Sequence, residues 1–311
     1  MRDESQRPDP VPRTVWRVRL LSICVALMAL SFSQKPGRLV ADTKFDLLEA
    51  PGAFLASSLS LWDPSAAFGQ LQNQAYGYLF PMGPFFWLGD AVGLPMWIVQ
   101  RLWWSTLLIV AFLGMWKLSG ALVVSSPWAR IAGSLVYALS PRILAELTVM
   151  SVEVWPMALA PWILWPLVDR GRRSWGWRIG GSALAVLCLG GVNAVASGAA
   201  LVPPAMWFAT RRPTWQTLRW AALWVGAVVA GILWWLGPLV VLGRYSPPFL
   251  DWIEGISVTS GVASVFESVR GTSAWLGFLL TRNGPTWPGG FVFVSERPLI
   301  LVTVFVVAAG L

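Results

Sequence analysis

The sequence contains no histidine among its 311 residues. A chain without imidazole has no histidine base, no histidine-bound metal and no Ser-His catalytic triad. Its two cysteines, Cys24 and Cys188, both fall inside apolar runs. They are expected to be small buried side chains, not a disulfide or a metal site.

Charged residues are also scarce, at 12% of the chain against 56% hydrophobic residues. Soluble domains usually carry about 25% charged residues, and the mean hydropathy here is +0.62. The sequence therefore predicts an all-α polytopic membrane protein. The 22 tryptophans support this prediction, because the indole ring favours the headgroup level of a bilayer.

The net charge of +8 does not indicate a nucleic-acid partner. The basic residues stand at the ends of hydrophobic segments, which is the positive-inside pattern of membrane proteins. The first apolar run is followed by residues 33–37, Ser-Gln-Lys-Pro-Gly, without a small-x-small cleavage site. We therefore interpret that run as a retained anchor and not as a signal peptide.

Hydropathy divides the chain into a basic cytoplasmic tail, residues 1–15, and a transmembrane domain, residues 16–311. Two large outer loops are expected, at residues 34–93 and 244–297, with an interfacial helix at 53–62 after Pro51. The expected crossings are residues 16–32, 94–117, 128–139, 154–168, two short spans within 179–209, 218–242, and a last one starting at 298. That last segment would cover only ~21 Å as a helix, so the sequence is interpreted as a truncated piece of a longer protein.

Residues 40–87, in the first outer loop, concentrate polar groups that suit sugar chemistry. They include three acids, Asp42, Asp46 and Glu49, followed by amides and tyrosines. Carboxylates at one membrane face suit sugar transfer from a lipid-phosphate donor. In that reaction a carboxylate deprotonates the acceptor hydroxyl and cations hold the leaving phosphate.

Several segments of the chain resemble the actinobacterial alpha-(1→3)-arabinofuranosyltransferase family. They are Ala-Asp-Thr-Lys-Phe-Asp at 41–46, Leu-Trp-Asp-Pro at 61–64, the stretch from Gln72 to Phe85, and Tyr-Ala-Leu-Ser-Pro-Arg at 137–142. The resemblance implies a GT-C transmembrane bundle and transfer of arabinofuranose from decaprenyl-phospho-arabinose to envelope arabinan, of the arabinogalactan or lipoarabinomannan type. It also implies a longer protein with later carbohydrate-binding modules.

In GT-C enzymes the base is an acid shortly after the first span, which the resemblance places at Asp42, with Asp46 second. Two structural alternatives stay open. Asp42 also suits a turn, and Asp46 with Glu49 also suits a capping box. No cofactor is predicted, although binding of a divalent cation by Asp42 and Asp46 stays an open alternative.

Three arginines are candidates for holding the donor phosphate: Arg142, Arg101 and Arg270. Arg142 is preferred because it follows the Ser140-Pro141 helix break, and its alternative is a helical ion pair with Glu146. Arg101 lies within the second span, and a snorkelling side chain is slightly favoured there. The candidates for sugar and acceptor binding are Gln72, Asn73, Gln74, Tyr76 and Trp62. An equally good interpretation is a polar loop whose side chains form hydrogen bonds with its own backbone.

The expected partners are a polyprenyl-phosphate sugar donor, a polysaccharide acceptor and the lipid bilayer, with no nucleic acid. The protein is expected in the plasma membrane with its active site on the extracytoplasmic face. The basic inner loops at 169–178 and 211–219 also suit an acidic cytoplasmic partner, although a role in topology alone is favoured. Alternative functions are a GT-C enzyme with another donor sugar such as mannose, a transporter or flippase of lipid-linked sugars, and a non-catalytic scaffold.

Overall fold

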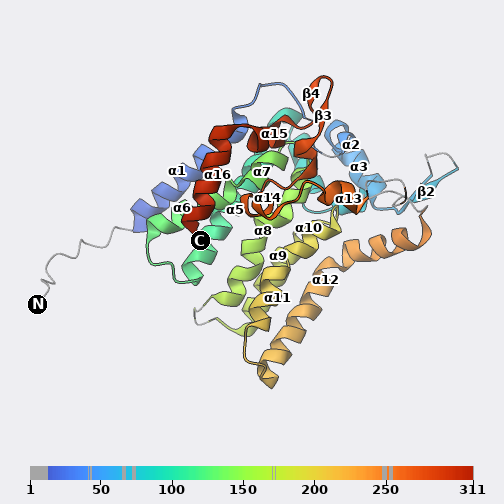
Figure 1. Ribbon diagram of the computed structural model, residues 1–311. Coiled ribbons are helices and arrows are strands. Elements are labelled where there is room, and N and C mark those ends of the chain that lie inside the picture. The colour runs from blue at the N-terminus through green and yellow to red at the C-terminus, as the bar shows by residue number, and fades with distance from the viewer. Residues whose placement is uncertain are drawn as a thin grey trace, which may run out of the picture.

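The computed structural model describes residues 13–40, 42, 44–64, 68–71, 75–169, 171, 173–246, 251 and 255–310 (Figure 1). Within these residues the fold is a bundle of helices, which confirms the predicted all-α membrane fold. The described strands are two short antiparallel pairs. β1 (Trp62–Asp63) pairs with β2 (Gln70–Leu71), and β3 (Leu280–Thr281) pairs with β4 (Gly284–Pro285).

In the described part of the chain, four helices are long and apolar enough to cross a membrane. They are α1 (Arg13–Phe32), α5 (Met96–Ala121), α8 (Ser151–Val168) and α12 (Trp215–Tyr245). A fifth crossing results if α15 (Pro288–Ser295) and α16 (Arg297–Gly310), which are bent by 75°, act as one span. These helices agree with the crossings predicted at 16–32, 94–117, 154–168 and 218–242.

The other predicted crossings contain shorter helices. They are α6 (Pro127–Ala138), α9 (Trp175–Leu187), α10 (Ala194–Ala199) and α11 (Val202–Ala209). Each falls short of the ~20 residues that a full crossing needs. Local capping sets these limits, since Ser126 and Asn193 accept N-cap hydrogen bonds at the starts of α6 and α10. Gly190, at φ 78°, lies in the break between α9 and α10, as predicted.

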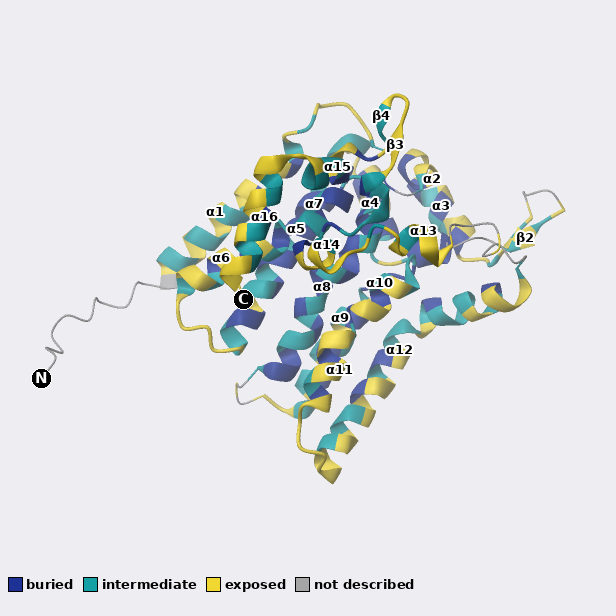
Figure 2. Ribbon diagram, in the orientation of Figure 1, coloured by how far each residue is buried: buried dark blue, intermediate teal, exposed yellow. Residues whose placement is uncertain are grey.

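The centre of the bundle is formed by α5 and α8, which pack along one another. α1 and α6 pack on α5, and α9 packs between α8 and α12. Over their membrane windows, 61% of α5 and 67% of α8 is buried, against 11% of α1 and 17% of α12. Figure 2 shows this contrast, with buried residues concentrated on the central helices. α1 and α12 therefore leave most of their surface uncovered by the described part of the chain.

Three prolines lie inside α8, and the structure compensates for at least one of them. Pro161 has no N–H, so the carbonyl of Met157 lacks its usual helical donor. The Oη atom of Tyr137, on α6, donates to that carbonyl at 2.5 Å. An apolar helix with interior prolines is thus fixed to its neighbour by a side-chain hydrogen bond.

Both large loops lie at the end of the bundle where α8 begins, which we call the loop end. The first contributes α2 (Phe45–Glu49), α3 (Pro51–Ser58), η2 (Ala75–Tyr78) and α4 (Met82–Ala91). The second contributes α13 (Ile256–Ser260), α14 (Val265–Arg270), η4 (Trp275–Phe278) and α15. The second covers α7 (Pro141–Glu146), where the Nε1 atom of Trp287 donates to the Ala145 carbonyl at 2.6 Å.

Two local predictions in the first loop are wrong. The interfacial helix ends at Ser58 instead of residue 62, because Trp62 pairs with Leu71 as a strand. The capping box of Asp46 and Glu49 does not form. The N-cap of α2 is Lys44, which makes no side-chain capping bond. Asp46 instead lies inside the first turn of this short helix.

The opposite end of the bundle, where α8 ends and α12 begins, is called the basic end. Arg173, Arg178, Arg211, Arg212 and Arg219 lie in or next to its turns. α8 has 18 residues, so the two ends of the bundle are about 27 Å apart along it. This length is close to the ~30 Å of a bilayer's hydrocarbon core.

Candidate active site

The segment between α1 and α2 is attached to the start of α5 by side chains. Gln100 binds both backbone groups of Val40: its Oε1 atom accepts from the Val40 N–H at 3.1 Å, and its Nε2 atom donates to the Val40 carbonyl at 2.7 Å. The Nη2 atom of Arg101 donates to the Arg38 carbonyl at 3.0 Å. These contacts position the next polar residue, Asp42.

Asp42 lies between the central helices α5 and α8, with 1% of its surface exposed. Its Oδ2 atom accepts from the Nε1 of Trp104 at 3.0 Å, and its Oδ1 accepts from the backbone N–H of Ser151 at 2.8 Å. Ser151 is the first residue of α8, so the carboxylate occupies a helix N-terminus, where negative charge is favoured.

Burial raises the pKa of the Asp42 carboxyl above its usual range, although its hydrogen bonds with Ser151 and Trp104 act in the opposite direction. A raised pKa makes the carboxylate a stronger proton acceptor, which suits a general base. The same contacts also join the first loop to both central helices. Asp42 is therefore placed for two roles, proton transfer and attachment of the loop.

A small cavity of about 10 Å³ adjoins the partners of Asp42. Trp103, Val152 and Trp155 line it on the α5 and α8 side. The Nε1 of Trp103 donates to the Ser151 Oγ at 2.9 Å, and the rings of Trp103 and Trp155 are 4.8 Å apart. Residues 77, 80–82, 189, 190, 192, 193 and 197 line the cavity as well. Its volume suits about one water molecule, so a sugar would require the covering segments to move.

Arg101, one of the three phosphate candidates, lies beside Asp42 and is also buried. Its guanidinium stacks on the Trp104 ring at 4.2 Å, and the same indole donates to Asp42. The favoured snorkelling interpretation is wrong, because the guanidinium ends on the Arg38 carbonyl and on Gln100 with only 1% of the residue exposed. Two of the predicted site residues are thus joined through one tryptophan.

Arg142, the preferred phosphate candidate, forms the helical ion pair with Glu146 at 2.6 Å. The Arg142 side chain stays 37% exposed, whereas that of Glu146 is 4% exposed. Burial raises the pKa of Glu146 to about 7; the Arg142 charge lowers it, and the nearby Glu153 charge raises it. The second oxygen of Glu146, Oε2, is buried without a hydrogen-bond partner among the described residues.

Arg270, the third phosphate candidate, is 4% exposed and belongs to a separate cluster at the loop end. Its Nη1 atom pairs with Glu267 at 3.1 Å, its Nη2 donates to the Phe293 carbonyl at 2.7 Å, and its Nε donates to Thr303 at 2.8 Å. These contacts join α14, α15 and α16. The geometry suits a structural link between these helices.

The candidates for acceptor binding are only partly described. Gln72, Asn73 and Gln74 lie outside the described residues. Tyr76 is 2% exposed and packs against Trp235 and Leu242 of α12, and its hydroxyl is buried without a hydrogen-bond partner among the described residues. Burial also raises the pKa of Tyr76.

Trp62 is 52% exposed, and its ring lies over Gly69 so closely that a Cβ there would be 2.2 Å from it. The ring therefore lies against Gly69, next to β2, and about half of the residue stays exposed. Asp46 is exposed on α2. No cluster of three acidic or cysteine side chains able to hold a metal occurs among the described residues.

Comparison with known proteins identifies the family. Residues 26–311 match the family described as alpha-(1→3)-arabinofuranosyltransferase, N-terminal GT-C domain. The chain is 43% identical over 291 residues to an alpha-(1→3)-arabinofuranosyltransferase of Mycolicibacterium smegmatis, covering 93% of this chain and 20% of the relative. It is also 43% identical to one of Mycobacterium tuberculosis, covering 91% of this chain and 20% of that relative.

A solved structure supports the same relationship. The cryo-EM structure of arabinofuranosyltransferase AftD from Mycobacteria superposes with a TM-score of 0.73 at 38% identity, over 88% of this chain and 22% of the other. The chain thus spans about a fifth of the length of the curated relatives it matches. The chain belongs to the alpha-(1→3)-arabinofuranosyltransferase family and corresponds to its N-terminal GT-C membrane domain.

Proposed function

We propose that the protein containing this domain transfers arabinofuranose from a polyprenyl-phosphate donor to a cell-envelope arabinan. The family membership and the names of the relatives support the sugar and the reaction class. The positive-inside pattern supports a plasma-membrane orientation with the basic end in the cytoplasm and the loop end outside.

The observation that carries this proposal is the placement of Asp42. It is an acid shortly after the first span, buried between α5 and α8, with its pKa raised. In the proposed reaction Asp42 takes the proton of an acceptor hydroxyl. The hydroxyl oxygen attacks C1 of the arabinose with inversion, and the lipid phosphate leaves with the electrons of the broken bond.

The proposal requires the cavity lined by Trp103, Val152 and Trp155 to open toward Asp42. Its present volume of about 10 Å³ excludes a sugar. The segments that can uncover it are η2 with residues 80–82, which belong to the first loop, and the break at residues 189–193. Both are turns or short helices, whereas the opposite wall is formed by the packed helices α5 and α8. Substrate entry is therefore assigned to movement of these two covering segments.

Arg142 is the cation proposed to bind the donor phosphate, since its side chain is the most exposed of the three candidates. Glu146 neutralises it when no donor is bound. An incoming phosphate would compete for the guanidinium, and the raised pKa of Glu146 makes its protonated form accessible near neutral pH. Arg142 is therefore released from its ion pair at little electrostatic cost.

The test uses the purified full-length protein with synthetic polyprenyl-phospho-arabinofuranose or polyprenyl-phospho-mannose and an oligoarabinoside acceptor. Transfer from the arabinose donor should exceed transfer from the mannose donor by at least about tenfold. Arg142→Gln should weaken donor binding, whereas Glu146→Gln breaks the same ion pair, keeps the guanidinium and should preserve binding. Preferred use of the mannose donor, or donor movement across vesicles without transfer, would contradict the proposal.

A further inference from the structure

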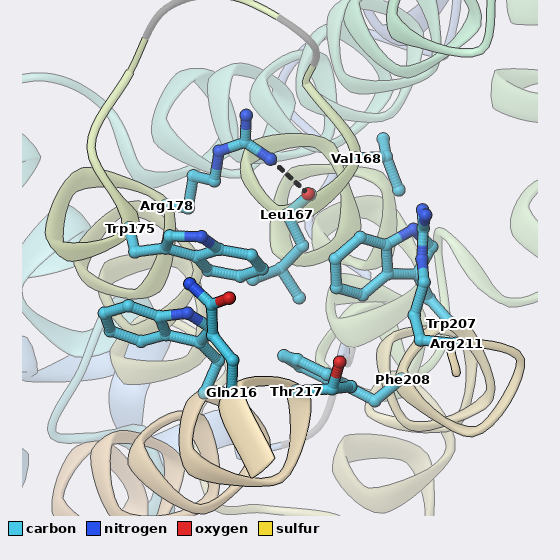
Figure 3. Close-up of a pocket in the computed structure, with 10 residues that line it drawn as sticks. Leu167, Val168, Trp175, Arg178, Trp207, Phe208, Arg211, Gln216 and Thr217 are labelled. Atoms are coloured by element: carbon cyan, nitrogen blue, oxygen red, sulfur yellow. Dashed lines mark hydrogen bonds between the residues drawn. The ribbon is translucent and has the colours of Figure 1, made fainter. Parts of the chain in front are cut away.

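The basic end of the bundle contains a second, larger cavity of about 560 Å³. It lies where α8 and α11 end and α9 and α12 begin, and Figure 3 shows its side chains arranged around an open centre. This volume is within the range of ligand pockets. α8 separates the cavity from Asp42 by about 27 Å, so it is not part of the candidate active site.

Two arginines supply positive charge to this cavity, and none of its described lining residues is acidic. Among the described residues, Arg178 donates two long hydrogen bonds, at 3.3 Å to the Leu167 carbonyl and 3.4 Å to the Gly171 carbonyl, and its guanidinium lies 5.3 Å from the Trp175 ring. Its Nε atom is buried without a hydrogen-bond partner among the described residues. Arg211 is exposed and lies over the ring of Trp207 at 4.4 Å. Both guanidiniums therefore have donors left for an anion.

Tryptophans form much of the remaining wall. The rings of Trp175 and Trp220 stack at 5.0 Å and 9°. The Nε1 of Trp220 is buried without a hydrogen-bond partner among the described residues, which is costly unless a ligand or water accepts from it. The cavity therefore has a rigid aromatic wall that contains one buried, unpaired indole N–H, and indole rings favour the headgroup level of a bilayer.

The start of α12 adds a favourable field. Gln216 and Thr217 belong to its first turn and line the cavity. A helix N-terminus carries partial positive charge, and α12 has 31 residues. Two arginines and a helix start thus line one space beside an aromatic wall, and charge-assisted donors of this kind bind a phosphate group.

We propose that this cavity binds the phosphate-bearing headgroup of an anionic glycerophospholipid. The surface next to it favours a lipid over a soluble anion, because only 17% of the α12 membrane window is buried. Leu223, about one helical turn beyond Trp220, is 47% exposed, so acyl chains can continue along α12 from the headgroup. The site is distinct from donor binding at the loop end and does not depend on it.

The test is native mass spectrometry of the full-length protein released from nanodiscs that contain equal amounts of phosphatidylglycerol and phosphatidylcholine. The wild type should retain phosphatidylglycerol preferentially. Arg211→Gln should reduce that retention about tenfold, the loss expected for one charge-assisted contact of about 1.4 kcal/mol. Trp220→Phe keeps the ring stack, removes the unpaired N–H and should reduce retention to a smaller degree.

Arg212→Gln is the matched control, because it removes the neighbouring charge from a residue that does not line the cavity. It should leave retention close to the wild-type value. Equal retention of the two lipids, or equal losses for Arg211→Gln and Arg212→Gln, would overturn the proposal. Complete displacement of the lipid by millimolar inorganic phosphate or by a hexaglutamate peptide would also overturn it, in favour of a soluble anion or an acidic protein.

Discussion

At the scale of single residues, Glu146 links ionisation to stability. Its pKa of about 7 in the folded protein lies above the ordinary value of 4.5. Between these values the folded state keeps a proton that the unfolded state has lost, so stability falls as pH rises from 4.5 to 7. The loss attributable to this residue is at most about 3 kcal/mol. The melting temperature of the full-length protein should therefore fall over this range.

Glu146→Gln removes the titrating group at nearly constant volume and should flatten the decline. Glu49→Gln, at an exposed position on α2, is the matched control and should keep the wild-type slope. Identical slopes for wild type and Glu146→Gln would show that the burial of Glu146 has no energetic consequence.

The sequence predicted the ion pair of Arg142 and Glu146 as an i,i+4 alternative, and the structure contains it. The burial of Glu146 was not predictable, because α7 is covered by the second loop through a hydrogen bond from Trp287 to Ala145. A contact between residues so distant in sequence leaves no local pattern. The partners of Asp42 were not predictable for the same reason, because Trp104 and Ser151 belong to two later helices.

At the scale of elements, the attachment of residues 38–42 to α5 depends on Gln100. Gln100→Ala leaves the N–H of Val40 without its side-chain partner, whereas the Val40 carbonyl loses one donor and keeps the Asp42 N–H at 2.7 Å. An unsatisfied group at a partly buried position costs up to about 1–3 kcal/mol, so we expect a lower melting temperature and faster proteolysis of the first loop. Ser105→Ala is the control on the same helix, because among the described residues that hydroxyl bonds the Arg101 carbonyl of its own helix. Equal effects of the two substitutions would contradict the attachment.

Hydropathy located the helices of the bundle but not their lengths. The short elements α6, α9, α10 and α11 end at caps and glycine turns, and a hydropathy window averages over these features. For Arg101 the helix was predicted correctly, but the environment of the side chain was not. Its position in an apolar run suggested snorkelling, but a backbone carbonyl of the first loop binds it inside the protein. The conformation of the first loop determines which group Arg101 binds, and no local sequence pattern indicates that conformation.

At the scale of the whole molecule, the loop end and the basic end should face opposite sides of the membrane. A reporter active only outside the cytoplasm should function when fused after Asp63 or Glu267, which lie at the loop end. It should be silent after Arg173 or Arg212, at the basic end. The reverse result at any of these points would place the proposed donor site in the cytoplasm and contradict the orientation.

The central claim is that Asp42 is the general base, and the rate of arabinofuranose transfer by the full-length protein tests it most directly. In Asp42→Asn, the side-chain oxygen still accepts from the Ser151 N–H, but the NH₂ group then faces the Trp104 N–H, which is also a donor. The substitution therefore lowers the stability of the protein and also removes the basic group. Trp104→Phe removes the same bond from the other partner and leaves the carboxylate intact. Asp46→Asn changes an exposed acid of the same loop.

Transfer should be normalised to folded protein, with donor binding measured in parallel. General-base catalysis contributes about 10²–10⁴-fold, so Asp42→Asn should lose transfer by that factor while donor binding persists. Trp104→Phe and Asp46→Asn should each lose less than about tenfold. A loss for Asp42→Asn no larger than that for Trp104→Phe would contradict the account and leave Asp42 as an attachment point of the first loop.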